Sequence, residues 1–182
     1  MKKLLVALLL FSTHAFAENN FYAGVSASVF NDTELKYSGM KVDKNSDVGV
    51  NAFTGYSFSI SPGMDLGVEV EYQHFGKAKF SRTESVEGEA FYVNVRPKFV
   101  ELGNNLYSAL IFGVGSMSSE ITIGGQKFKD SDLSYQAGFE IGYMIDQLDI
   151  GIGYRYQTAD FDAFNGLDVS NQGVVIGVRY NF

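Results

Sequence analysis

The sequence predicts an all-β protein: an eight-stranded antiparallel up-and-down transmembrane β-barrel in a single domain. Three observations lead to this fold class. Apolar and polar residues alternate with a period of two, the alternation comes in segments of roughly ten residues, and long and short connections between the segments alternate strictly. The 182 residues suit one domain, and a helical period of 3.6 residues is not evident.

The beginning of the chain (1–17) differs from the rest and is interpreted as a cleaved secretory signal peptide. Two lysines follow the first Met, an apolar run covers 4–11, and Ala15 and Ala17 supply an A-x-A cleavage site. The apolar run is well short of the roughly 20 residues of a membrane-spanning helix. We therefore expect cleavage after Ala17, export, and a barrel domain over 18–182.

The alternating segments predict the eight strands. They cover 21–30, 48–60, 64–73, 90–101, 106–117, 133–145, 148–158 and 169–182. The connections are long at 31–47, 76–89, 118–132 and 159–168, and short at 61–63, 102–105 and 146–147. Short periplasmic turns and long external loops produce this rhythm, which places both termini on the periplasmic side and four loops on the outside.

Two of the segments carry a specific expectation. Pro97 interrupts the apolar face of the fourth segment and removes one ladder donor, so a bulge or other irregularity is expected there. In the fifth segment, Leu110, Phe112 and Val114 are placed outward because this turns Gly113 inward. A register shifted by one residue remains open for that segment.

The polar face of the strands decides between a membrane and a soluble barrel. A lipocalin-like barrel would also alternate, but its interior would be an apolar ligand cavity. Here the polar face carries seven charged residues, which suit a closed network of opposite charges. They are Glu69, Glu71, Arg96, Lys98, Glu140, Arg155 and Arg179. The apolar face must then point outward into lipid, because in water it would far exceed the patches that soluble monomers expose.

Within this network we predict an ion pair between Glu140 and Arg155. A tight hairpin at Asp146 and Gln147 sets the two residues one diagonal step apart on the inward face. Interlocked charges in a lumen just wide enough for side chains predict a plugged barrel and not a general porin. Structural packing is favoured over an ion gate as the role of these charges.

The composition excludes several classes of function. Cysteine is absent, which removes disulfides, zinc-thiolate sites and thiol nucleophiles. Without the signal the chain carries 12 basic and 21 acidic residues, a net charge of −9, so nucleic-acid binding is not expected. Paired aspartates at 130 and 132 and at 160 and 162 lack the fuller oxygen set that calcium requires. No metal or cofactor is assigned.

The C-terminal residues carry a family resemblance. They alternate and end in Phe, with Val178, Tyr180 and Phe182 on one face. This end resembles the C-terminal signal of outer-membrane barrels. The chain from residue 18 resembles the OmpA/OmpX/opacity-type outer-membrane β-barrel superfamily, which includes accessory colonisation factor-like proteins. The resemblance implies a location in the outer membrane of a Gram-negative envelope and insertion by the barrel-assembly machinery.

One cluster of cations lies at the outer end of the third segment. His74, Lys77, Lys79 and Arg82 lie where cations can meet the phosphates of lipopolysaccharide, and a merely solvated rim explains them equally well. His74 is the only histidine after the signal, and no Ser lies within two residues of it. A histidine-dependent lipid hydrolase is therefore disfavoured, and no catalytic residue is assigned.

The leading functional hypothesis is a non-enzymatic, monomeric outer-membrane protein. Its four loops would contact a host or surface ligand in adhesion or colonisation, or the barrel would support the envelope. A narrow channel or small-solute binding barrel is the alternative, and a lipid-modifying enzyme is the third reading. Members of the superfamily include examples of several such roles, so the fold alone leaves the function open.

Overall fold

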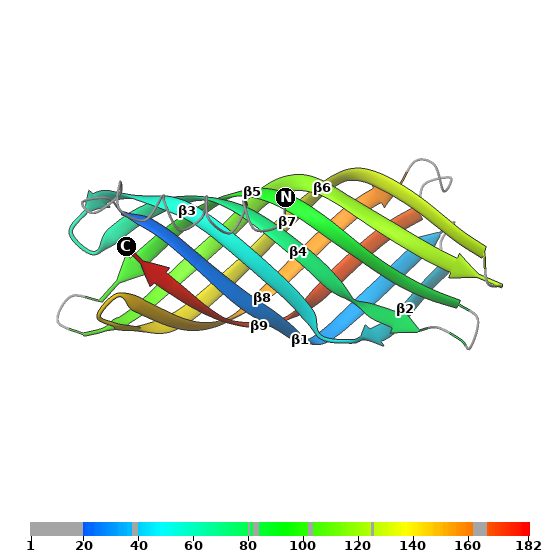
Figure 1. The fold of residues 1–182 in the computed structure, drawn as a ribbon, viewed down its shortest axis with the longest axis horizontal. Helices are drawn as coiled ribbons and strands as arrows, with labels where there is room; N and C mark the ends of the chain where they lie inside the picture. Colours follow the sequence, from blue (N-terminus) through cyan, green and yellow to red (C-terminus); the bar gives the residue numbers. More distant parts are fainter. Residues whose placement is uncertain are drawn as a thin grey trace, which may run out of the picture.

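The computed structural model describes a barrel of antiparallel strands (Figure 1). It describes residues 20–37, 40–79, 81, 84–101, 104–124, 126–161 and 167–182. The strands are β1 (Phe21–Tyr37), β2 (Met40–Ser46), β3 (Gly49–Ser61), β4 (Met64–Lys79), β5 (Glu84–Val100), β6 (Leu106–Ile123), β7 (Gln126–Ile145), β8 (Leu148–Phe161) and β9 (Leu167–Asn181). Pairing of β1 with β9 closes the sheet. Among the described residues, no helix is long and apolar enough to cross a membrane.

The ring has eight strand positions, because β2 and β3 are two parts of one barrel strand. Against β1, Ser28 lies opposite Gly49 and Asn31 opposite Ser46, which is one continuous register. Strand β4 meets both parts in a common register as well. Only residues 47–48 separate them. The predicted eight-stranded, all-β, up-and-down barrel is therefore confirmed.

The predicted extent of the long outer loops is wrong. Half or more of each segment continues the barrel as a β-hairpin, and β6 and β7 stay paired as far as Ile123 opposite Gln126. Likewise, the 31–47 segment pairs with itself as far as Tyr37 opposite Met40. The stretches between successive outer strands shorten to 38–39, 80–83, 124–125 and 162–166. A search for apolar and polar alternation misses such strands, because both of their faces carry polar residues.

The predicted inward and outward faces are confirmed. On β4, Glu71 is fully buried whereas its neighbour Val70 is 55% exposed. The register chosen for the fifth segment is also correct, because Leu110 and Phe112 are exposed and Ile111 between them is buried. A one-residue slip would have reversed both sets of side chains.

Pro97 interrupts the ladder without bulging it. The β5–β6 pairing passes from Val95 opposite Phe112 directly to Lys98 opposite Ala109, and the register does not change. The missing N–H of Pro97 therefore interrupts the hydrogen bonds between β5 and β6 only locally.

A bulge lies instead in β1, around Phe30. The register of β1 against β9 shifts there, and Phe30 has a φ of 52°, in the left-handed region that a non-glycine residue rarely adopts. The Asn31 Nδ2 donates hydrogen bonds to the backbone oxygens of Ser28 (2.9 Å) and Asp47 (3.0 Å). These two bonds hold the bulge, which leaves the Phe30 side chain 89% exposed.

The outward face defines which parts of the strands span the membrane. On β3, alternate residues from Val50 to Ile60 face outward, and about ten tilted residues rise about 25 Å, the height of a lipid-facing band. Aromatic residues lie at the periplasmic end of this band, where the Tyr180 and Phe182 rings lie 5.0 Å apart. Above His74, which lies opposite Val50, the outward face becomes charged.

Candidate functional site: the polar interior

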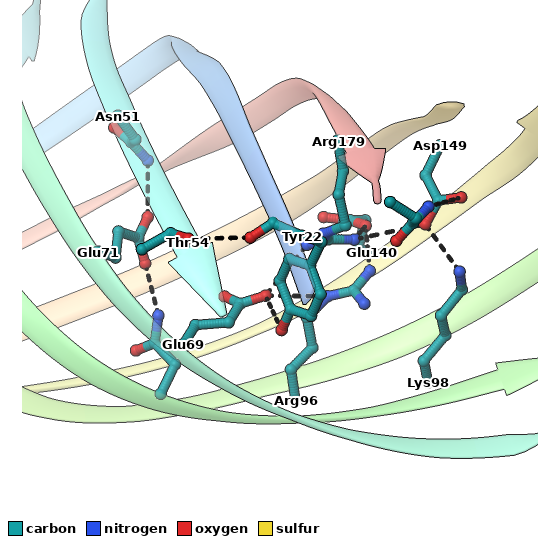
Figure 2. A network of polar contacts seen from close by, with 12 residues as sticks. Tyr22, Asn51, Thr54, Glu69, Glu71, Arg96, Lys98, Glu140, Asp149 and Arg179 are labelled. Carbon is teal, nitrogen blue, oxygen red and sulfur yellow. Dashed lines mark hydrogen bonds and ion pairs between the residues drawn. The ribbon is translucent and has the colours of Figure 1, made fainter. Parts of the chain in front are cut away.

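Polar side chains fill the interior of the barrel in layers (Figure 2). The structure turns all seven predicted interior charges inward. Glu69, Glu71, Arg96, Arg155 and Arg179 are buried, and Lys98 and Glu140 are half-buried. Burying charges in a low-dielectric interior requires that they be paired and hydrogen-bonded, so the partners of each decide what the layers can do.

The layer nearest the periplasm joins Lys98 to Asp149. The Lys98 Nζ lies 2.7 Å from the Asp149 carboxylate, which also accepts a hydrogen bond from the Asn181 side chain (3.2 Å). Asp149 is only 2% exposed and was not among the predicted interior charges. Those seven residues carry a net charge of +1, and this imbalance is the sequence signal that points to a missing carboxylate.

The middle layer is a ring of two carboxylates and two guanidinium groups. Arg96 reaches Glu140 at 2.6 Å and Glu69 at 3.7 Å. Arg179 reaches Glu69 at 3.1 Å and Glu140 at 3.7 Å. Each charge therefore touches two of the opposite sign, and the ring carries no net charge.

Two tyrosine rings close this layer from the sides. The hydroxyl groups of Tyr22 and Tyr107 donate hydrogen bonds to the two carboxylates of the ring, at 3.1 and 2.8 Å. Inward glycines make room for them. A Cβ on Gly67 would lie 2.5 Å from the Tyr22 hydroxyl oxygen, and a Cβ on Gly142 would lie equally close to that of Tyr107. The tyrosine rings therefore pack directly against the inward glycines.

The layer above is centred on Glu71. Arg155 Nη1 contacts both Glu71 oxygens, at 2.9 and 3.0 Å. The side-chain amides of Asn51 (3.1 Å), Asn94 (2.7 Å) and Gln136 (2.9 Å) donate to the same carboxylate. Five hydrogen bonds therefore satisfy one fully buried carboxylate.

The predicted ion pair between Arg155 and Glu140 is wrong. Arg155 pairs with Glu71 across the lumen, and Glu140 pairs with Arg96 from another strand. The hairpin register is as expected, with Gly138 opposite Arg155. Long side chains in a narrow barrel reach across the lumen, so the nearest neighbour along the wall does not determine the partner.

An apolar cluster closes the interior toward the outside. Its buried members are Phe75, Ala90, Tyr92, Met117, Ala159 and Val169. Tyr92 of this cluster shares a hydrogen bond of 2.7 Å with Ser134, and Gln157 donates one of 2.6 Å to Gln73. Two interior cavities lined by described residues measure only about 20 and 10 Å³, room for about one water each. The charged layers and the apolar cluster together form a plug in the barrel interior.

The predicted cation cluster lies outside the barrel, at the upper edge of the apolar band. His74 and Lys79 are exposed there, and Lys77 lies 3.4 Å from Glu87. Arg82, like the cleavage-site residues Ala15 and Ala17, lies outside the described residues. In the part of the chain that the structure describes, no group of three or more His, Asp and Glu residues is placed to hold a metal ion.

The C-terminal residues form the closing seam of the barrel. Val178, Tyr180 and Phe182 all face outward and are 40 to 42% exposed. The backbone N–H of Phe182 donates to the Phe21 carbonyl at 2.9 Å, and the rings of these two residues lie 5.8 Å apart. The chain end is therefore fixed against the first strand.

Comparison with known proteins agrees with this architecture. Residues 4–182 match the family described as outer membrane protein beta-barrel domain. Among curated proteins, none matches the sequence. Similar solved structures include Neisserial surface protein A (NspA), at a TM-score of 0.63 and 14% identity over 90% of this chain and 97% of that one.

Two other similar structures have lower TM-scores. Ail, the attachment invasion locus protein of Yersinia pestis, in complex with the heparin analogue sucrose octasulfate, has a TM-score of 0.52 at 20% identity over 90% of this chain and 99% of that one. The outer membrane protease OmpT of Escherichia coli has 0.52 at 10% identity over 91% and 97%. Identities this low show the fold alone. The family match is decisive: the chain belongs to the outer membrane protein β-barrel domain family and resides in the Gram-negative outer membrane.

Proposed function

We propose that the protein is a non-enzymatic surface protein that uses its projecting β-hairpins for contact in adhesion or colonisation. The observation that carries this proposal is the combination of a plugged interior with strands that continue well above the apolar band. A barrel built in this way offers its ordered surface outside the membrane. The surface protein NspA and the attachment protein Ail have similar folds.

The plug argues against the channel alternative. The interior charges satisfy one another across the lumen, and passage of an ion would require several of these contacts to break together. Removing one partner of a buried pair costs several kcal/mol, roughly 3 to 5. The closed state is therefore strongly favoured.

The same pairing argues against an enzyme. The described carboxylates and cations of the interior contact each other, and Glu71 is completely buried beneath the apolar cluster. The likeness to the protease OmpT is one of fold at 10% identity. A fold of this kind accommodates many functions, so it brings no catalytic assignment with it.

The charge of the outer segments indicates the chemistry of the partner. The segments 31–47, 76–89, 118–132 and 159–168 contain 13 acidic and 8 basic residues. A surface with this excess of carboxylates repels polyanions. We therefore propose a partner with a cationic contact surface, in contrast to the sulfated heparin analogue bound by Ail.

Ion pairs across the hairpins stiffen this surface. Lys127 lies 2.6 Å from Glu120 across the β6–β7 hairpin, and Lys41 lies 2.7 Å from Glu34 across β1 and β2. The hydrogen bond from Lys127 lowers the pKa of Glu120, and the bond from Lys41 to Glu34 raises the pKa of Lys41. These groups stay ionised at neutral pH, and an ordered surface loses less conformational entropy on binding.

The proposal is tested by shortening one hairpin. Ala159 and Val169 lie opposite each other, so a two-residue Asn-Gly turn can replace 160–168 without changing the register, and this removes three aspartates and no basic residue. Bacteria that carry this variant should adhere less than bacteria with the wild-type protein to immobilised cationic protein and to host epithelial cells. Replacing Asp146-Gln147, a periplasmic turn, by Asn-Gly is the matched control and should leave adherence unchanged.

Gel mobility with and without boiling verifies that each variant is folded. Equal adherence of the wild type and the shortened variant on both surfaces would contradict the proposal.

A further inference from the structure

Above the membrane, two gaps divide the barrel into two walls. The pairing of β7 with β8 ends at Ser134 opposite Ala159, although β7 continues outward to Gln126. Half a ring away, β2 meets β4 at one pair among the described residues, Ser46 opposite Ala78. One wall therefore consists of the outer parts of β4 to β7, and the opposite wall consists of the outer parts of β8, β9, β1 and β2.

Each wall carries a row of apolar residues across its inner face. In the β4–β7 wall, Ala78 lies opposite Val86, and the pairings lead from Val86 across β6 to Phe128. In the opposite wall, the pairings join Ala159, Val169, Leu35 and Val42. Directly paired residues share one face of a sheet, and Ala78, Val86 and Val169 are buried, so both rows lie on the inner side.

The row of the β4–β7 wall ends in an uncovered phenyl ring. Phe128 is 45% exposed, whereas Val86 of the same row is buried. Phe128 lies on the part of β7 that continues beyond the last pair with β8, so the gap between these strands gives access to its ring from the side. An uncovered aromatic ring on an apolar inner face is a docking position for another apolar side chain.

The inner face next to Phe128 is acidic. Along β7, Asp130 and Asp132 follow at alternate positions, and they lie opposite Ser119 and Met117 of β6. Both of these partners are buried, which places the two aspartates on the inner side of the wall. Two carboxylates therefore lie on the same face as the phenyl ring.

The lysines of the β4–β7 wall lie on its outer side. They are Lys77, Lys79, Lys127 and Lys129, which alternate with inward residues along β4 and β7. Three of the four lie within 3.4 Å of a glutamate on that side. In the opposite wall, Lys44 lies on the inner side, opposite Thr33, but it is on β2 and borders the other gap. The gap between β7 and β8 therefore suits a ligand that is both cationic and apolar.

We propose that the cationic partner of the outer surface inserts an apolar side chain beside Phe128, through the gap between β7 and β8, and pairs its basic residues with Asp130 and Asp132. The partner is then a basic segment that carries an apolar residue, and not a uniformly charged surface. This inference rests on the proposed function, because it assigns a place and a second chemical requirement to the same contact.

Binding of two synthetic peptides tests the inference. The protein is reconstituted in nanodiscs of phosphatidylcholine, which has no net charge, and binding is measured by calorimetry with empty nanodiscs as the blank. One decapeptide alternates lysine with leucine, and the other alternates lysine with serine. The wild type should bind the lysine–leucine peptide about tenfold more tightly, because burial of one leucine side chain is sufficient for a difference of this size.

Removal of the ring should abolish this preference. In Phe128→Ser, we expect binding of the lysine–leucine peptide to weaken about tenfold, while binding of the lysine–serine peptide stays the same. Phe30→Ser is the matched control, because it removes an exposed ring on β1, away from this gap, and it should change neither affinity. Gel mobility with and without boiling verifies that each variant is folded.

A second pair of variants tests the charges. Asp130→Asn combined with Asp132→Asn should weaken the binding of both peptides, because both carry lysine. The same loss of charge at Asp32 and Asp43, on the outer side of the opposite wall, should leave both affinities unchanged. Equal effects of the two double variants would contradict the assigned place.

The outcomes separate this inference from the proposed function. If the wild type binds the two peptides equally, or if the wild type and Phe128→Ser bind the lysine–leucine peptide equally, the inserted apolar side chain is refuted and the cationic partner still stands. If the wild type binds neither peptide, the proposed cationic partner fails together with the inference.

Discussion

Removal of Arg155 should destabilise the barrel severely without opening it. The two hydrogens of Arg155 Nη1 are shared among three acceptors, the two Glu71 oxygens and, at 3.2 Å, the Gln136 side-chain oxygen. In Arg155→Ala, the Glu71 carboxylate stays buried without a counter-charge, and the side chain that filled the lumen is gone. The layer loses its neutrality.

The expected loss of stability depends on the hydrogen bonds that Glu71 keeps in the variant. Removing one member of a buried pair costs about 3 to 5 kcal/mol. Because three side-chain amides still donate to Glu71, we expect a loss near the lower end, about 3 kcal/mol. In the double variant Glu71→Gln, Arg155→Gln both charges are absent and amide hydrogen bonds remain, so its loss should be smaller by about 2 kcal/mol.

The measurement is urea unfolding in detergent micelles, followed by the gel mobility of unboiled samples. The wild type, Glu71→Gln, Arg155→Gln and the double variant form the cycle that gives the coupling free energy directly. If Arg155→Ala unfolds at the same urea concentration as the wild type, the pair with Glu71 does not hold the upper layer together. If the double variant is as unstable as the single one, packing and not charge accounts for the loss.

Three further predictions concern the plug, a hairpin and the chain end. The wild-type protein in planar bilayers should show no steady conductance, and sustained open levels would disprove the plug. The carboxyl group of Glu120 should titrate below its ordinary pKa of 4.5, so its pairing with Lys127 is present above that pH and is lost as the pH falls through the lowered value; NMR titration of Lys127→Gln should show a higher pKa. Phe182→Ser should reduce the amount of folded barrel in the outer membrane, measured by gel mobility, while an unchanged amount would remove the role of this residue in assembly.

The period-two pattern predicted the barrel, the number of strand positions and the inward residues, because a strand with one wet and one lipid-facing side must alternate. It did not predict the outer hairpins, where Glu120 and Lys127 give the strands a polar outward face that the lipid-facing part of the same strands lacks. The outward face of the strands is apolar only within the membrane, so a search for that pattern finds only the membrane-spanning part.

The composition of the interior site could be predicted better than its pairing. The period-two alternation placed Glu71 and Arg155 inside correctly, because it can be followed along each strand alone. The partner of Arg155 depends on which side chains meet across the lumen, and this is set by strand tilt and stagger around the whole ring. Asp149 was missed as a member, although the charge imbalance of the predicted set pointed to it.

The position of Arg179 on the last strand links electrostatics to closure of the barrel. Until β9 docks against β1, Arg179 is separated from Glu69 of β4, because the two strands meet across the lumen only in the closed ring. In an unfinished barrel Glu69 thus lacks one of its two cationic partners, at a depth where hydrocarbon cannot solvate a charge. Docking of the final strand brings Arg179 to Glu69. The buried charges are therefore neutralised in the same step that removes the last open edge of the sheet.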